Sequence, residues 1–181
     1  RVEALRRRID DALLDLVAGA EPAALYQPVR YVLAGGGKRL RPILLVLTAE
    51  AFGAPVARAL PAALAVELFH NFTLVHDDII DGDATRRGRP TVHVRWDTNT
   101  AILGGDLLMA LAYDALTRTE VDGPRLRRLL AAFHPMAERL CAGQALDLAF
   151  ETEEKVSVQA YLHMIDGKTG ALVAAVFALG A

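Results

Sequence analysis

Three aspartates of one short motif are followed closely by two arginines in residues 77–87. Asp77, Asp78 and Asp81 belong to the sequence DDIID, and Arg86 and Arg87 follow it. On a helix, Asp77 and Asp81 lie one turn apart on one face and repel each other unless a cation sits between them, whereas Asp78 is turned about a quarter-circle away. Mg²⁺ binds a few carboxylate oxygens and shares the rest of its shell with water and phosphate. Arginine pairs well with phosphate oxygens. The pattern therefore predicts a magnesium site on Asp77 and Asp81 and a diphosphate ligand.

A helix must position these acids. The segment 62–80 contains no glycine or proline and repeats apolar residues at helical intervals, so it predicts a helix that ends at the motif. An acidic motif at a helix end can also be a solvated or capping cluster. Here Leu74, Val75, Ile79 and Ile80 would bury most of the helix surface, which favours acids placed at the mouth of a pocket.

A second basic cluster, in the sequence GGGKRLRP, precedes this helix. Pro42 suits the first turn of a helix that extends to residue 52. Lys38 and Arg41 would then lie at a helix N-terminus, where backbone N–H groups and the helix dipole also attract an anion. The pattern predicts an anion site, and a flexible basic surface loop is the alternative.

Other polar residues interrupt apolar helical segments, where an unpaired polar group is costly. His70 precedes Asp77 by about two turns on nearly the same side of the predicted helix, so it is either a ligand contact or a core residue. Gln144 and Asp147 share one face of a long predicted helix over 125–150. Both are interpreted either as pocket residues or as hydrogen-bonded core.

Three segments are expected to depart from regular helix. Residues 83–90 predict a loop, and residues 91–98 predict irregular structure. Two glycines flank Lys168 and Thr169 within a helical pattern. This arrangement indicates either a kink that turns polar groups inward or a simple break between two helices.

Composition sets the fold class and excludes some partners. The 181 residues are 53% hydrophobic but only 6% aromatic, and they are rich in alanine and leucine, which predicts an all-α single domain over 1–181. The net charge of −2 gives no basic field for nucleic acid. No uncharged apolar run reaches the ~18 residues of a membrane span. The single cysteine, Cys141, fits a reducing, cytoplasmic compartment.

Four motifs together carry a family resemblance. DDIID followed by RRGRPTVH, with GGGKRLRP upstream and KTGAL downstream, resembles the trans-isoprenyl diphosphate synthases of the polyprenyl synthetase family. The resemblance implies an isoprenoid synthase-type helical bundle around a central cavity. That family continues into a second aspartate-rich motif. The chain begins at Arg1 and stops within an apolar stretch, so we expect a longer protein with its C-terminal part missing here.

The resemblance also implies a reaction. A Mg²⁺-dependent trans-prenyltransferase would ionise an allylic diphosphate (dimethylallyl, geranyl or farnesyl), and isopentenyl diphosphate would attack the resulting cation in a head-to-tail elongation. The DDIID motif has no extra residues inside it and is similar to that of enzymes that stop at geranylgeranyl, so we expect a C15 to C20 product. A homodimer is expected.

Most site roles follow from the same resemblance, whereas Gln144 and Thr73 are assigned from their positions on predicted helices. The residues assigned to isopentenyl diphosphate are Lys38, Arg41, His70 and Arg87. The residues assigned to the allylic diphosphate are Arg86, Lys168, Thr169 and Gln144, with Thr169 beside the reacting carbon. Phe72 and Thr73 are expected to limit chain length, Thr73 from helical geometry and Phe72 from the resemblance.

Three other functions compete with this one. A class I terpene cyclase also uses an aspartate-rich helix, but it needs no site for isopentenyl diphosphate. A noncatalytic partner subunit of a heteromeric prenyl synthase would keep the fold and lose ligands, whereas the motifs present here are intact. A purely structural helical bundle is the third alternative.

Overall fold

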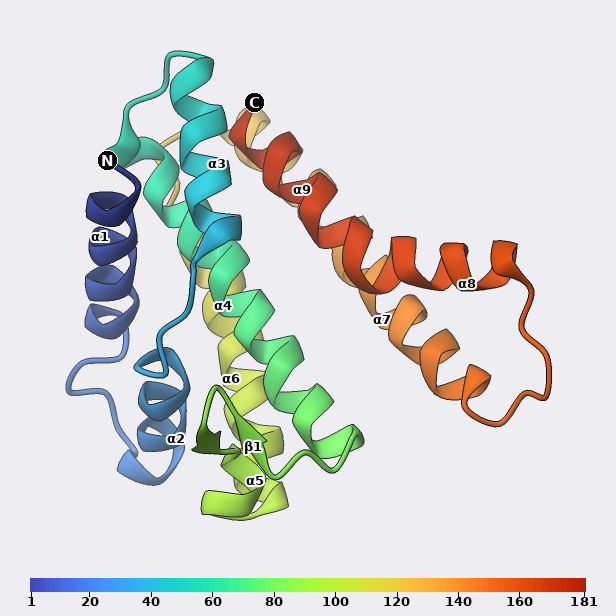
Figure 1. Ribbon diagram of the computed structural model, residues 1–181. Helices are drawn as coiled ribbons and strands as arrows, with labels where there is room; N and C mark the ends of the chain where they lie inside the picture. The colour runs from blue at the N-terminus through green and yellow to red at the C-terminus, as the bar shows by residue number, and fades with distance from the viewer. The chain divides into compact units, whose positions relative to one another are not determined.

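A computed structural model describes residues 1–181, and the chain is helical almost throughout (Figure 1). The α-helices are α1 Val2–Asp15, α2 Ala23–Leu33, α3 Leu40–Ala51, α4 Val56–Ile80, α5 Val92–Arg95, α6 Thr98–Thr117, α7 Gly123–Phe150, α8 Val158–Ile165 and α9 Ala171–Gly180. A π-helix, η1 Asp166–Gly170, joins α8 to α9, and strands β1 Thr85–Arg86 and β2 Arg89–Pro90 form a hairpin. The all-α prediction is confirmed.

The chain separates into two compact units. Unit 1 consists of Arg1–Ile43 and Leu60–Thr119, and unit 2 consists of Leu44–Ala59 and Glu120–Ala181. Each is described by itself below. The single domain and the central cavity expected from the sequence stay predictions.

The core of unit 1 is built from helical faces. Within it, α2 packs against α1 and α6, and α5 packs against α6. Ile9 of α1, Phe69 of α4 and Leu108 of α6 are buried almost completely. Burying such a side chain contributes about 1.5–3 kcal/mol relative to leaving it exposed, so these faces fix how the site-bearing helices pack.

The helix that carries the acids begins earlier than the sequence predicts. Residue 62 was the expected start because Pro61 breaks a helical pattern, but α4 begins at Val56 and includes Pro61. Pro61 is the sixth residue of α4, beyond the first four N–H groups that lack intrahelical partners in any helix. It therefore removes about one hydrogen bond from the second turn, and burial of the α4 face offsets this loss.

The expected loop at 83–90 contains the β-hairpin. Arg86 pairs with Arg89 across a two-residue connection, Arg87–Gly88, in which both residues have positive φ (53° and 73°). Positive φ at both positions is typical of a type I′ turn, whose twist suits a tight hairpin. The irregular segment that follows is also more ordered than expected, because α5 occupies Val92–Arg95.

In unit 2, α7 packs against α8, α9 and η1. The chain changes direction between α8 and α9, at the π-helix (Figure 1). A Cβ at Gly143 of α7 would lie 2.2 Å from the Lys168 backbone nitrogen, so the two backbones cross in close contact. The sequence left open whether this point is a kink or a break. The structure has a continuous helical path with one π-turn.

Two helical stretches, Thr98–Thr117 and Val158–Gly180, are long and apolar enough to cross a membrane by length and composition alone. In each, 39% of the most apolar window is buried within the protein. Core helices pass the same test, so this is weak evidence for a span. The expectation of no membrane span stays a prediction.

Candidate active site

The acidic motif lies at the C-terminus of α4. The Asp81 N–H donates to the Asp77 carbonyl (2.8 Å), so both residues belong to one helical turn. Gly82, with φ of 67°, and Asp83 then close the helix through bonds to the carbonyls of Ile79 and Asp78. This pattern is a Schellman motif. The Asp77 side chain is half-buried and that of Asp81 is exposed.

These carboxylates suit a hard divalent cation. Acids at a helix C-terminus face the negative end of the helix dipole, which is unfavourable until a cation neutralises them. No group of three or more His, Cys, Asp or Glu side chains is arranged to enclose a metal ion. Two carboxylates one helical turn apart fit Mg²⁺, because Mg²⁺ keeps several waters and binds substrate phosphate rather than a full protein cage. Asp77 and Asp81 remain the predicted ligands.

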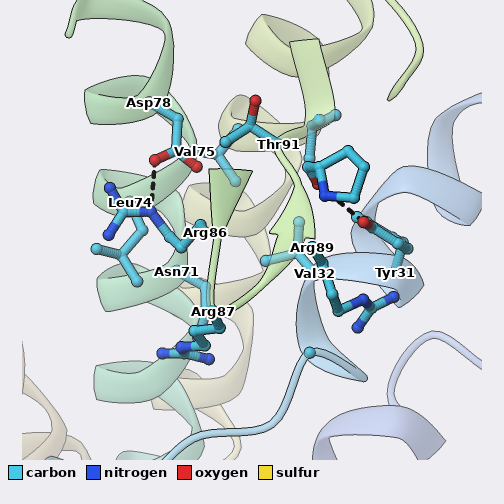
Figure 2. Close-up of a pocket in the computed structure, with 13 residues that line it drawn as sticks. Tyr31, Val32, Asn71, Leu74, Val75, Asp78, Arg86, Arg87, Arg89 and Thr91 are labelled. Atoms are coloured by element: carbon cyan, nitrogen blue, oxygen red, sulfur yellow. Dashed lines mark hydrogen bonds and ion pairs between the residues drawn. The ribbon is translucent and has the colours of Figure 1, made fainter. Parts of the chain in front are cut away.

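Asp78 has a different partner. Its side chain is buried, and its Oδ1 accepts a short hydrogen bond from Nε of Arg86 on the hairpin (Figure 2). Burial raises the pKa of Asp78, and the Arg86 charge and hydrogen bond oppose that rise. The sequence predicted only that Asp78 points away from Asp77. In the structure, the Asp78 carboxylate binds Arg86 and holds it against α4.

The four residues assigned to isopentenyl diphosphate meet at one cavity of about 420 Å³ in unit 1. Its lining consists of Gly37, Lys38, Arg39, Leu40, Arg41, Glu67, His70 and Arg87. α3 begins at Leu40, so its N-terminal N–H groups also adjoin this cavity. Four cations, Lys38, Arg39, Arg41 and Arg87, and a helix N-terminus adjoin one cavity, which favours an anion site over a flexible surface loop.

His70 contributes to this cavity as a neutral group. Burial, followed by the charges of Arg41 and Arg87, lowers the pKa of His70 to about 3. Its Nε2 lies 3.1 Å from Nη1 of Arg41. Arginine can only donate, so Nε2 accepts and the proton of the neutral ring is on Nδ1. Burial also lowers the pKa of Arg41, with Glu67 opposing.

The hairpin carries Arg87 between two cavities. Arg87 lines the basic cavity and also a smaller one of about 50 Å³, shown in Figure 2. Its Nη1 donates to the Gly36 carbonyl. Burial, and then repulsion by Arg39, lower the pKa of Arg87. A ligand anion in the basic cavity would relieve this repulsion between cations.

Tyr31 of α2 anchors the hairpin, a role that the sequence analysis missed. Its hydroxyl donates to the Pro90 carbonyl at 2.8 Å (Figure 2), and Arg89 lies over its ring at 3.9 Å from the centroid. Arg95 lies over the same ring at 4.3 Å, and Trp96 meets it edge-on. An aromatic residue seven positions before Lys38 gives no periodic signal, so only the fold reveals this contact.

The other residues assigned to the allylic diphosphate, besides Arg86, lie in unit 2. Lys168 of η1 donates to Asp147 of α7 in an ion pair at 2.5 Å. Nε2 of Gln144 is buried without a hydrogen-bond partner. A buried orphan donor calls for an acceptor from water or ligand, which favours the pocket interpretation of Gln144 over core. Thr169 is exposed. The roles of these residues toward the allylic diphosphate stay predictions.

The chain-length candidates differ in environment. Phe72 is half-buried, and its ring meets those of Phe69 (5.2 Å between centroids) and His76 (4.9 Å) edge-on. Thr73 is buried, and its hydroxyl donates to the His70 carbonyl. Thr73 therefore satisfies its own polar group within the helix, and Phe72 offers the larger removable volume.

Residues 22–181 match the family model described as Polyprenyl synthetase. The chain belongs to the polyprenyl synthetase family. A geranylgeranyl diphosphate synthase of Methanosarcina mazei is 45% identical over 96% of this polyprenyl synthetase chain and 53% of the relative. A (2E,6E)-farnesyl diphosphate synthase of Mycobacterium bovis is 44% identical over 80% of this chain and 40% of the relative.

Solved structures agree with this assignment. The geranylgeranyl pyrophosphate synthetase of Pyrococcus horikoshii superposes with a TM-score of 0.96 at 43% identity, over 99% of this chain and 55% of that one. The chain thus spans about half the length of the relatives it matches. The isoprenoid synthase-type helical fold inferred from the sequence motifs is confirmed for this polyprenyl synthetase chain.

Proposed function

We propose that the protein containing this chain is a trans-prenyltransferase that condenses isopentenyl diphosphate with an allylic diphosphate. The observation that carries the proposal is the basic cavity, in which Lys38, Arg41, His70 and Arg87 converge within unit 1. A site for the diphosphate of a second substrate is what an elongating enzyme needs and a single-substrate cyclase does not. This cavity therefore favours elongation over the cyclase alternative.

In the proposed reaction, the C–O bond of the allylic substrate breaks and its diphosphate leaves. The double bond of isopentenyl diphosphate attacks the allylic carbon, and loss of a proton restores a double bond. Arg86, Lys168 and Gln144 would bind the allylic diphosphate. Asp77 and Asp81 would hold Mg²⁺, which when bound neutralises charge on the leaving group.

Charge development decides which of these interactions accelerate the reaction. Negative charge on the leaving diphosphate grows as the C–O bond breaks, so cationic groups aimed at it stabilise the transition state more than the ground state. Groups that hold isopentenyl diphosphate bind it equally before and during bond formation. Lys38 and Arg41 should therefore contribute mainly to affinity.

We further propose a dimethylallyl, geranyl or farnesyl primer, a C15 to C20 product, a homodimer and a cytoplasmic location. Relatives named for the C15 and C20 products match this chain at 44% and 45% identity, so identity alone does not separate them. A noncatalytic partner subunit is the remaining alternative, and its test is turnover itself.

The first experiment gives the full-length protein radiolabelled isopentenyl diphosphate with each allylic primer, with Mg²⁺ or with a chelator. We expect labelled, elongated diphosphates only when Mg²⁺ and both substrates are present. Conversion of an allylic diphosphate alone into a hydrocarbon would identify a cyclase instead. Absence of any incorporation would favour the noncatalytic subunit.

The second experiment separates the two substrates. Lys38→Ala and Arg41→Ala should each raise KM for isopentenyl diphosphate by about 10- to 100-fold, because each removes a hydrogen bond to a charged group. Arg86→Ala should act mainly through the allylic substrate. Lys155→Ala and Arg58→Ala, at exposed positions, are matched controls. Equal effects of the first three variants on both KM values would contradict the division of sites.

A further inference from the structure

Arg39 is the one cation of the GGGKRLRP motif that points into the protein interior. It is 3% exposed, and its guanidinium donates in three directions. Nε donates to Asp10 of α1 (2.7 Å), Nη1 to Glu67 of α4 (2.5 Å) and Nη2 to the Leu33 carbonyl at the end of α2 (2.8 Å). A single side chain therefore ties three helices to the first residue before α3.

The backbone at Arg39 needs this anchoring. Its φ is 49°, in the left-handed region that glycine tolerates and other residues rarely adopt. Gly36 and Gly37 before it also have positive φ. The Arg39 side chain turns inward from this backbone and forms one wall of the basic cavity, beside Lys38 and Arg41. Anchoring Arg39 thus fixes where these two cations lie.

The charge of Arg39 has a second consequence. Glu67 is 2% exposed and lines the basic cavity, where it also attracts Arg41. Burial disfavours the charged form of Arg39, but the attraction of Glu67 and the bonds to Glu67 and Asp10 outweigh it and raise the pKa of Arg39. Arg39 therefore satisfies Glu67, and Arg41 is left to contact His70 at 3.1 Å.

We propose that Arg39 is a positioning residue of the diphosphate cavity, which holds the left-handed turn and keeps Glu67 from capturing Arg41. The inference rests on the proposed function, because the anion it serves is the diphosphate of isopentenyl diphosphate. Arg39 lines the cavity, but its guanidinium already donates to Asp10, Glu67 and the Leu33 carbonyl. Its effect therefore reaches the ligand through Lys38 and Arg41.

The test measures the Kd of isopentenyl diphosphate on the full-length protein by calorimetry, for four variants. Arg39→Met should raise Kd by about 10- to 100-fold, the scale of loss expected when binding groups are misplaced by about 1 Å. Adding Glu67→Gln to Arg39→Met should lower Kd again by about tenfold, because the Glu67 carboxylate can then no longer capture Arg41. If Arg39 has a merely structural role, the double variant should instead bind more weakly than Arg39→Met, since a second buried partner has been removed.

If circular dichroism shows that Arg39→Met is unfolded, Arg39→Lys is the variant to measure. It keeps the charge but cannot make three directed bonds, and we expect about a tenfold rise in Kd. Arg30→Met is the matched control, because Arg30 donates to the Val17 carbonyl and does not line the cavity. Its Kd should equal that of the unaltered protein. In folded single variants, kcat at saturating substrates should change less than Kd.

The outcomes separate this inference from the proposed function. If the unaltered protein does not bind isopentenyl diphosphate, both are overturned. If it binds, but Arg39→Met or Arg39→Lys binds equally well, only the positioning role is overturned. The same holds if the double variant binds more weakly than Arg39→Met.

Discussion

Asp77, Asp78 and Asp81 are three identical side chains in three environments. Asp77 is half-buried, Asp78 is buried against Arg86, and Asp81 is exposed just beyond the end of α4. Environment decides what each carboxylate can do. The pair one turn apart can share a metal, whereas Asp78 is already committed to an arginine.

The three acids should therefore respond differently to substitution. Asp77→Ala and Asp81→Ala should each lower kcat by about 1000-fold or more, because they support charge neutralisation in the transition state. Asp78→Asn should lower kcat by only about 10-fold, through looser placement of Arg86. The measurement is kcat at saturating substrates over a range of Mg²⁺ concentrations. A loss in Asp78→Asn as large as in Asp77→Ala would contradict the assignment.

His70 makes stability depend on pH. Its folded-state pKa of about 3 lies below the ordinary value of 6.5, because burial and nearby arginines disfavour the charged ring. The unfolded chain then binds the proton more readily. The contribution of neutral His70 to the free energy of unfolding is therefore fully present above about pH 6.5 and is lost as pH falls toward about 3.

The unaltered protein should accordingly lose stability faster than His70→Asn on acidification. At about 1.4 kcal/mol per pKa unit, the difference should reach roughly 2–3 kcal/mol near pH 4.5. Urea unfolding of both proteins, near neutral pH and near pH 4.5, measures it. Parallel losses in the two proteins would show that His70 keeps an ordinary pKa.

Residue types predicted most of the basic cavity, but not the orientation of its cations. The motif predicted Lys38 and Arg41 at a helix N-terminus, but residue type alone cannot tell which of the neighbouring cations Lys38, Arg39 and Arg41 turns inward. That choice depends on Glu67 and Asp10, which come from distant parts of the sequence. Long-range ion pairs leave no periodic trace, so only the fold assigns Arg39 to the interior.

At the scale of elements, long apolar helices were predictable and short irregular pieces were not. α4 and α7 have 25 and 28 residues, so the helix-forming preference of the whole segment outweighs individual exceptions. The hairpin strands have two residues each, too few for an alternating pattern to show. Two tertiary hydrogen bonds stabilise the hairpin, one from Arg86 to the Asp78 carboxylate and one from the Tyr31 hydroxyl to the Pro90 carbonyl.

The π-helix η1 illustrates the same limit. Two glycines around Lys168–Thr169 indicated an irregularity, but its type depends on how closely α7 approaches. A Cβ at Gly143 would lie 2.2 Å from the Lys168 nitrogen, and a Cβ at Gly167 would lie 2.8 Å from the Arg139 carbonyl oxygen. The crossing therefore requires glycine on both helices, and it sets the position of Lys168.

Gly143→Ala should push the two backbones apart. Overpacking of this kind costs about 1–3 kcal/mol, which at about 2–4 °C per kcal/mol corresponds to a fall in Tm of about 2–12 °C. Gly123→Ala on the same helix is the matched control, because its nearest neighbour is Arg127 Nη1 at 3.9 Å, and its Tm should change little. Equal Tm values for both variants would show that the crossing relaxes without cost.

At the scale of the whole molecule, the chain belongs to the polyprenyl synthetase family, and the length of its product is the property to be measured. Relatives with different named products match at nearly the same identity, so we expect a few residues rather than the fold to set the product length. In the proposed reaction, a growing apolar tail must be shielded from water along its length. We therefore expect the volume available to the tail to decide where elongation stops.

Phe72 is the side chain whose removal should change that volume most. It precedes Asp77 by five residues, and ideal helical geometry turns it roughly 140° from Asp77, so its placement as a floor rests on the family resemblance. Its ring is held edge-on by Phe69 and His76. Phe72→Ala removes an aromatic ring from this cluster, whereas Thr73 already bonds within α4.

We expect Phe72→Ala to lengthen the product by at least one isoprene unit, measured by chromatography of the dephosphorylated products. Phe52→Ala is the matched control, because Phe52 is 70% exposed at the end of α3, and its product distribution should stay unchanged. Thr73→Ala should shift the distribution less than Phe72→Ala, because it removes a smaller side chain. If Phe72→Ala releases the same products as the unaltered protein, the residue that stops elongation lies on another helix.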